Sequence, residues 1–477
     1  MLLDQDTNNN KRLLISTKSL LDHDDTNNEH GYQTINQLKD EESVLFNQEL
    51  YLKIISSKIT SIHIQALLLY ILSLVTLSFL IFQMTILSRL IQAQYLQTVF
   101  EMSLSISLTF FGISAGIVIN YYYLNDDFSF KNKVIVCSSI TCSLGLLIIV
   151  TRSEFIMYLA YPILIFVYSI KFFSISNFFE GLFQHEQYDT MKSYLLGLFS
   201  LTFLFVFLNF TQVKNWQLFL ISSLVLNFSI LIFSIFISEE PRYYLKINQE
   251  HIFFDQLEKI NDNPINEGER KHILEEMKKM DLDDKSSRLS SLFSDEFHLF
   301  GILYFIITCL ISYVTVGMAV IGVFYCYDEH YRTRNTLKPL FYFLIISVFG
   351  PFFGLFLSCY TRIKRKILII THFCLLIILA FLMIFFNMAT QYIGGVFLFF
   401  SLSLAILFMK FGKEIYSNNH HYKLKILFCF TIFSFAFVSV LIINSLLFNR
   451  LNASLISLVV ISFTGLILSI FINLDLV

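Results

Sequence analysis

Lys171 is the residue of this sequence best placed to do chemistry inside an apolar environment. It stands about two-thirds of the way along the apolar run Phe155–Phe178, where a charged side chain is costly and usually serves a function. An ammonium group there predicts a contact for an anion or a carboxylate, or an amine that gives up its proton on burial. The alternative is a side chain that snorkels to the inner aqueous face and keeps its charge solvated.

Uncharged polar side chains complete the candidate binding site, namely Tyr168 in the same run and Gln83, Tyr313 and Asn444 in other runs. A pocket for a small solute needs a few such groups among aromatic side chains, and the chain has 54 Phe. Hydrogen bonds between neighbouring helices are the alternative role for each of them. Glu101, at the start of the second run, is a candidate for a proton-coupling carboxylate.

Catalytic chemistry is not indicated by any motif. The sequence has no phosphate-binding glycine loop, no G-x-S-x-G and no H-E-x-x-H. Its seven cysteines form no C-x-x-C pair and have no metal-ligand spacing with histidine. The net charge of −2 gives no reason to expect a nucleic acid. We therefore expect no enzyme, no cofactor, no metal and no nucleic-acid partner.

The elements that must position these side chains are long apolar runs. Hydrophobic residues make up 55% of the 477 residues and charged residues 15%, and runs of roughly twenty apolar residues are long enough to cross a bilayer. Twelve runs are present, at Ile62–Leu87, Phe100–Tyr122, Val134–Thr151, Phe155–Phe178, Tyr194–Asn209, Trp216–Ile237, Leu299–Cys326, Leu340–Cys359, Ile367–Phe386, Tyr392–Phe411, Leu424–Leu447 and Leu451–Leu474.

The runs predict an all-α membrane protein of twelve transmembrane helices in two six-helix halves. They do not alternate apolar and polar residues over about ten positions, as the strands of a membrane barrel do. We expect an acidic, disordered cytosolic tail at 1–59, an N-terminal half at 60–237, a helical cytosolic loop at 238–298 and a C-terminal half at 299–477. We expect the first membrane helix to serve also as the targeting signal, because the polar start resembles neither a signal peptide nor a transit peptide.

The positions of Lys and Arg predict that both termini face the cytosol. With this orientation, ten of these residues lie in the short inner loops and seven in the outer loops. The loop 238–298 adds nine more on the inner side. Within that loop, 251–260 and 267–280 each place apolar residues on one helical face. We expect both helices to lie against the cytosolic end of the bundle, with a membrane-surface position as the alternative.

The sequence S-E-E-P-R-Y-Y-L at 238–245 predicts the start of a short helix after the sixth run. Pro241 suits the first turn, whose N–H has no partner, and the acids before it would lie at the positive end of the helix dipole. Arg242 is placed to bond across the inner gate of a bundle. A generic helix start beside a membrane is the alternative.

Gly112, Gly116 and Asn120 stand four residues apart in the second run. Glycines at this spacing let another helix approach closely. We expect Gly112 and Gly116 to lie against a helix of the opposite half, and all three residues to take part in gating.

Further gating candidates stand at the predicted inner ends of the second half. Arg362 and Arg365 belong to the basic stretch T-R-I-K-R-K at 361–366, which begins ten residues after Pro351. Glu414 opens the sequence E-I-Y-S after the tenth run. A positively charged inner side explains the basic residues, but it does not explain the proline spacing.

Together these four stretches resemble the signatures of the major facilitator superfamily, nearest to its organic cation/anion and sugar-porter-like branch. Residues 238–245 are similar to P-E-S-P-R-[WY]-L and 112–120 to G-x-x-x-G-x-x-x-D. The stretch 361–366 is similar to D-R-x-G-R-[RK], and E-I-Y-S to the start of E-[LI]-Y-P-T-x-x-R. The resemblance covers roughly residues 60–475, and it departs from the family at the signature Asp, which is replaced by Asn120 and Thr361.

The resemblance implies a secondary transporter whose halves rock around a central cavity without ATP hydrolysis. None of the six runs in the second half contains Asp or Glu, whereas cation transporters of this branch carry an acid in their eleventh helix. An anionic or neutral small organic solute is therefore favoured. The alternative is a transport-inactive relative that acts as a membrane receptor or structural subunit, because the signature Asp is missing twice.

The expected partners are a small-molecule solute, membrane lipid and a coupling proton or ion. The expected state is a monomer, inserted as a multi-pass protein in the plasma membrane or an endomembrane.

Overall fold

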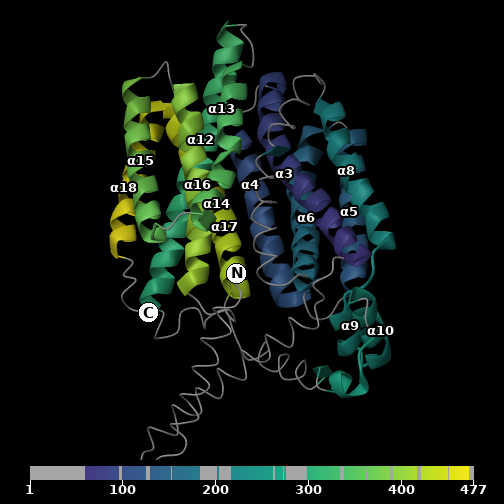
Figure 1. The fold of residues 1–477 in the computed structure, drawn as a ribbon. Helices are drawn as coiled ribbons and strands as arrows, with labels where there is room; N and C mark the ends of the chain where they lie inside the picture. The colour runs from purple at the N-terminus through teal and green to yellow at the C-terminus, as the bar shows by residue number, and fades with distance from the viewer. Residues whose placement is uncertain are drawn as a thin grey trace, which may run out of the picture. The chain divides into compact units, whose positions relative to one another are not determined.

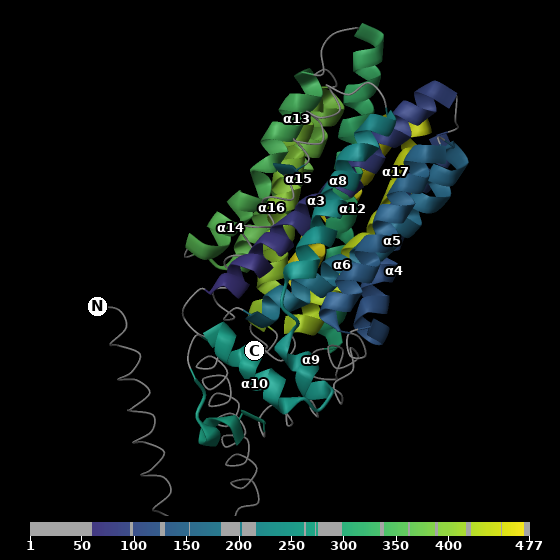
Figure 2. The ribbon, with the colours of Figure 1, turned by 90° about the vertical axis from the view of Figure 1, so that its right-hand side faces the viewer.

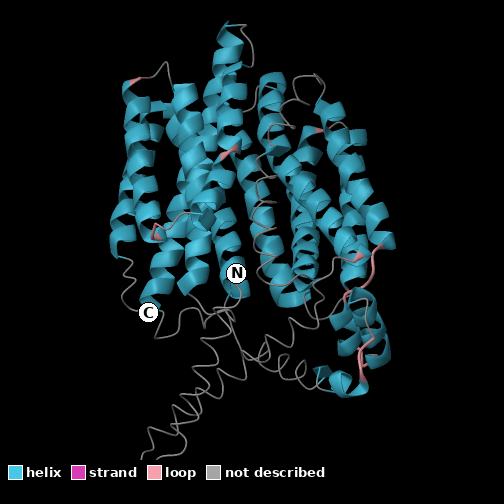
Figure 3. Cartoon of the chain, in the orientation of Figure 1, coloured by secondary structure: helices cyan, strands magenta, loops and turns pink. Residues whose placement is uncertain are grey.

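The computed structural model describes residues 60–95, 99–124, 129–151, 153–182, 201–202, 216–261, 264–271, 273–274, 298–333, 338–360, 363–386, 390–415, 421–449 and 451–471. All regular structure in these segments is helical (Figure 3). Ten of the described helices are long and apolar enough to cross a membrane. The prediction of an all-α membrane protein is confirmed.

The described helices of the N-terminal half follow the predicted runs closely. They are α3 (Ser61–Tyr95), α4 (Val99–Ile119), α5 (Phe130–Thr151), α6 (Glu154–Leu182) and α8 (Trp216–Phe236), and α4 continues into a π-helical turn at Asn120–Leu124. Of the run predicted at Tyr194–Asn209, only residues 201–202 are described, and they are helical. Helix α6 packs against α3, α4 and α5, and α8 packs against α3 and α5 (Figure 1).

The C-terminal half contains α12 (His298–Thr333), α13 (Lys338–Val348), α14 (Gly350–Tyr360), α15 (Arg365–Phe385), α16 (Thr390–Ile415), α17 (His421–Asn449) and α18 (Leu451–Phe471). The predicted run Leu340–Cys359 is divided at Phe349 into α13 and α14. Proline has no N–H and breaks the regular ladder of a helix, so Pro351 explains the break. The N–H of Phe349 bonds back to the carbonyl of Ile346 at 3.4 Å.

Buried apolar side chains form two large clusters, one in each half. The first includes Tyr70, Tyr161 and Phe179, and the second includes Phe343 and Phe373. Two buried residues belong to the cluster of the opposite half. Ile106 of α4 is part of the second cluster, and Ile426 of α17 is part of the first. Helices α4 and α17 pack against each other and so join the two halves.

The loop between the halves contains α9 (Pro241–Lys246) and α10 (Glu250–Asn261), which pack together at one end of the long helices (Figures 1 and 2). Pro241 occupies the first turn of α9, as predicted. The helix predicted at 251–260 is confirmed, and its residues Phe253, Phe254 and Ile260 are buried in the protein. This burial argues against the membrane-surface alternative. Of the helix predicted at 267–280, residues 267–271 and 273–274 are helical, and the others lie outside the described residues.

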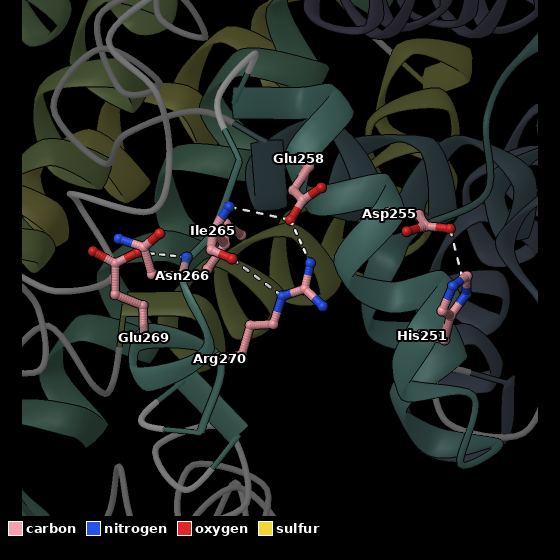
Figure 4. Close-up of polar contacts among 7 residues, drawn as sticks. All are labelled: His251, Asp255, Glu258, Ile265, Asn266, Glu269 and Arg270. Atoms are coloured by element: carbon pink, nitrogen blue, oxygen red, sulfur yellow. Dashed lines mark hydrogen bonds and ion pairs between the residues drawn. The ribbon is translucent and has the colours of Figure 1, made fainter.

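An ion pair connects α10 to the helical segment at 267–271 (Figure 4). Arg270 Nη2 lies 2.7 Å from Glu258 Oε1, and its guanidinium carbon lies 5.2 Å from the centroid of the Phe254 ring. Glu258 also accepts a hydrogen bond from the backbone N–H of Ile265 at 3.1 Å. This N–H and the Arg270 guanidinium lower the pKa of Glu258. Its carboxylate is therefore ionised at neutral pH and keeps its contacts with Ile265 and Arg270.

Candidate functional site

Lys171 is fully buried between helices of the N-terminal half. Its Nζ donates a hydrogen bond to Asn227 Oδ1 of α8 at 3.0 Å and lies 4.0 Å from the centroid of the Tyr168 ring. Asn227 Oδ1 also accepts a hydrogen bond from Thr141 of α5 at 3.4 Å. The amide is held in this orientation because Asn227 Nδ2 donates to the carbonyl of Ser223 at 3.0 Å. The amine therefore faces α5 and α8.

This position contradicts one of the two roles weighed for Lys171. Snorkelling is contradicted, because the side chain is 0% exposed. The contacts also do not place the amine toward the opposite half, since Asn227, Tyr168 and Thr141 all belong to the N-terminal half. The sequence could not show this, because the partner that orients the amine lies 56 residues away.

The other polar candidates are also buried, and the two tyrosines bond within their own halves. Tyr168 donates to the carbonyl of Ser73 on α3 at 2.8 Å. Tyr313 of α12 donates to Ser457 Oγ of α18 at 3.0 Å. These bonds fit the alternative role of linking neighbouring helices. Gln83 on α3 is 0% exposed.

Asn444 differs from the other candidates in two respects. It is 1% exposed on α17, the helix that joins the halves, and neither its Oδ1 nor its Nδ2 has a hydrogen-bond partner among the described residues. Buried side-chain amides are usually paired, so an unpaired one indicates a special role.

Gly112 and Gly116 make a close helix contact, but with a helix of their own half. A Cβ atom added at Gly112 would lie 2.8 Å from the carbonyl oxygen of Pro162, and one at Gly116 would overlap Ser169 Oγ. Both partners belong to α6, so the prediction of a contact with the opposite half is wrong. Glycine spacing shows that some helix approaches closely, and it does not identify that helix.

The C-terminal half repeats this arrangement. A Cβ atom at Gly350 would overlap the carbonyl oxygen of Phe399, and one at Gly354 would lie 2.6 Å from the carbonyl oxygen of Ser403. Helix α14 therefore packs on α16 as α4 packs on α6. Sequence reasoning missed this pair, although the spacing Gly350-x-x-x-Gly354 was visible beside Pro351.

A model of the Major Facilitator Superfamily matches residues 66–412 of the sequence. The chain belongs to the Major Facilitator Superfamily. Solved structures of this superfamily share its fold. The xylose transporter XylE from E. coli, in a partially occluded inward-open conformation, matches with a TM-score of 0.64 and 11% identity over 86% of this chain and 98% of that one. The nucleoside transporter NupG matches with a TM-score of 0.58 and 11% identity over 85% and 98%. A comparison with curated protein sequences found no match.

The residue at the signature Asp position of the superfamily is held by a helix of its own half. Asn120 Oδ1 accepts a hydrogen bond from Ser174 Oγ of α6 at 2.9 Å. It is also the first residue of the π-helical turn that ends α4, and such turns often mark functional positions. Lys133 Nζ donates to the carbonyl of Leu124, at the end of this turn, at 3.0 Å.

The acids before Pro241 act on a different helix from the predicted one. Glu239 accepts hydrogen bonds from Ser129 Oγ and from the backbone N–H of Lys131 at 3.2 Å, so its carboxylate lies at the start of α5. The expected dipole interaction is therefore made with α5. Glu240, the N-cap residue of α9, makes no side-chain capping bond.

The remaining gating candidates are described in part. Arg365 Nη2 donates to the carbonyl of Ser358 at 3.3 Å and so connects the start of α15 to α14. Arg362 lies outside the described residues, as do the side chains of Glu101, Arg242 and Glu414.

Sequence reasoning also missed two buried polar contacts inside the superfamily fold. One is the pairing of Asn227 with Lys171. The other is His372 of α15, which is 3% exposed and lies 2.9 Å from Ser403 Oγ of α16. The signal available was a polar side chain inside an apolar run, but only the fold shows which of these side chains meet.

Proposed function

We propose that this chain is a secondary transporter that carries a small organic solute across a membrane by alternating access. Membership of the Major Facilitator Superfamily and the fold shared with sugar and nucleoside transporters support a transport function. The observation that carries the mechanism is the contact of α4 with α17 between two separate apolar clusters. In alternating access the two halves rock against each other, and this motion requires a contact between the halves, such as that of α4 with α17, that can close and open.

The proposed solute is neutral or anionic. The ten candidate spans contain no Asp or Glu, so a cation would find no carboxylate there to offset its loss of hydration. Lys171 could attract an anion, but its amine is bonded to Asn227 inside the N-terminal half. These contacts favour a neutral solute over an anionic one.

The proposed solute contacts are Lys171, Tyr168, Gln83, Tyr313 and Asn444. The proposed gating residues are Gly112, Gly116, Asn120, Arg242, Arg362, Arg365 and Glu414. A coupling proton or ion is part of the same proposal, and XylE, one of the structural neighbours, is described as a proton:xylose symporter.

Uptake by the purified protein in sealed lipid vesicles is the direct test. We expect accumulation of at least one neutral or anionic solute from a mixed panel, and none by protein-free vesicles. Absence of uptake across the panel, with correctly folded protein, would favour the receptor or structural-subunit alternative. That alternative is motivated by the replacement of the signature Asp by Asn120 and Thr361.

The proposed topology places both termini and residues 238–298 in the cytosol. A protease site inserted in this loop should be cut only after the cells are permeabilised. A matched site in the predicted outer loop between the seventh and eighth runs should be cut in intact cells. Cleavage of the loop 238–298 from outside intact cells would overturn the topology.

A further inference from the structure

The inference concerns the buried amide of Asn444 and the surface that it faces. Phe433 and Phe437 of α17 contact Phe110 and Phe111 of α4, with ring centroids 6.4 and 5.9 Å apart. At 3.6 residues per turn, Asn444 lies within about 20° of both phenylalanines around the axis of α17. The amide therefore belongs to the face of α17 that packs on α4.

Helices α4 and α17 each contribute residues to both apolar clusters. Ile117 and Ile426 belong to the apolar cluster of the N-terminal half, and Ile106 and Val440 to that of the C-terminal half. Along α17, Asn444 lies about two turns beyond Phe437.

A second buried asparagine, Asn227, provides a comparison, because both the oxygen and the nitrogen of its side-chain amide are hydrogen-bonded to other residues. Asn227 is 2% exposed and Asn444 is 1% exposed, so both are removed from water to the same degree. Asn227 uses both ends of its amide, because it accepts from Lys171 and donates to Ser223. Asn444 uses neither end among the described residues. A buried amide without a partner lowers the stability of the state that buries it.

We propose that Asn444 is a gate amide: its unpaired amide destabilises the closed α4–α17 contact and gains hydrogen bonds, from water or from a hydroxyl of the solute, when the helices separate. This inference rests on the proposed alternating-access function. The described ring contacts between the two helices join phenylalanine to phenylalanine, and apolar contacts of this kind favour the closed state unless a polar group opposes them. An amide that is satisfied only in the open state brings the free energies of the two states closer together.

The first test compares the same substitution at the two asparagines, by thermal unfolding of the purified full chain. Leucine resembles asparagine in branching but needs no hydrogen bond. We expect Asn444→Leu to raise the midpoint by several degrees and Asn227→Leu to lower it. A lowered midpoint for Asn444→Leu, similar to that of Asn227→Leu, would show that the amide is structurally paired and would overturn the inference.

The second test measures the closed contact itself and needs no knowledge of the solute. Phe111→Cys and Phe437→Cys are combined, and closure is read as the rate of cross-linking by a short bifunctional thiol reagent, with each single cysteine variant as control. We expect Asn444→Leu and Asn444→Ala to increase this rate several-fold. We expect Asn444→Asp to decrease it, because a buried carboxylate would favour the open state.

Unchanged cross-linking in all three variants would overturn the gate amide and leave the transport proposal intact. Absence of uptake by the wild-type protein, with the cross-linking differences present, would instead overturn the transport proposal.

Discussion

Replacing Gly116 with alanine is expected to destabilise the N-terminal half strongly. The added Cβ atom would overlap Ser169 Oγ and would lie 2.8 Å from the carbonyl oxygen of Phe166. The hydroxyl could move, but the carbonyl belongs to the backbone of α6, so α4 and α6 must separate. Overpacking of this kind costs about 1–3 kcal/mol, and Gly116→Leu should exceed that range and prevent accumulation of folded protein.

The appropriate measurement is the fraction of detergent-solubilised protein that remains folded after stepwise heating, determined by size-exclusion chromatography. Gly268→Ala is the matched control, because a Cβ atom there meets nothing within 4 Å. Ser169→Ala should partly rescue Gly116→Ala, since it removes the overlapping hydroxyl. A Gly116→Leu protein with wild-type abundance and thermal midpoint would contradict the close approach of α4 and α6.

The glycine pair also shows what the sequence could and could not predict. The spacing of Gly112 and Gly116 correctly predicted a tight helix contact, because only a residue without a side chain permits it. It could not identify the partner, and we predicted the opposite half instead of α6. Gly350 and Gly354 make the same kind of contact with α16. This repetition supports a packing role for the glycine pairs, since each pair lets two helices of the same half approach closely.

The membrane helices were predictable for a different reason. A segment in hydrocarbon must be long and apolar, so the run Ile367–Phe386 coincides with α15 to within two residues at each end. Polar side chains inside such runs were visible as candidates, but their pairing was not. Lys171 of α6 meets Asn227 of α8 because both helices pack against α5 and α3 in the folded bundle. That the Asn444 amide has no hydrogen-bond partner among the described residues likewise appears only when its neighbours are known.

The Lys171–Asn227 pair gives the second large expected effect, as a double-mutant cycle. Asn227→Leu alone should be strongly destabilising, because it leaves the Lys171 amine buried without its amide acceptor. An unsatisfied buried polar group costs about 1–3 kcal/mol, and more when it is charged. Lys171→Met alone should be nearly neutral or stabilising, since apolar residues of similar size often replace buried charges without loss.

The double variant should therefore be more stable than Asn227→Leu alone, with a coupling energy of about 0.5–3 kcal/mol in thermal or denaturant unfolding. Additive effects would mean that the contact of 3.0 Å contributes nothing to the fold. Uptake separates this role from solute binding. If the amine only joins α6 to α8, Lys171→Met should transport a neutral or an anionic solute at close to the wild-type rate. If Lys171 binds the solute, the folded Lys171→Met protein should lose uptake of the anionic solute alone, because only an anion requires the positive charge.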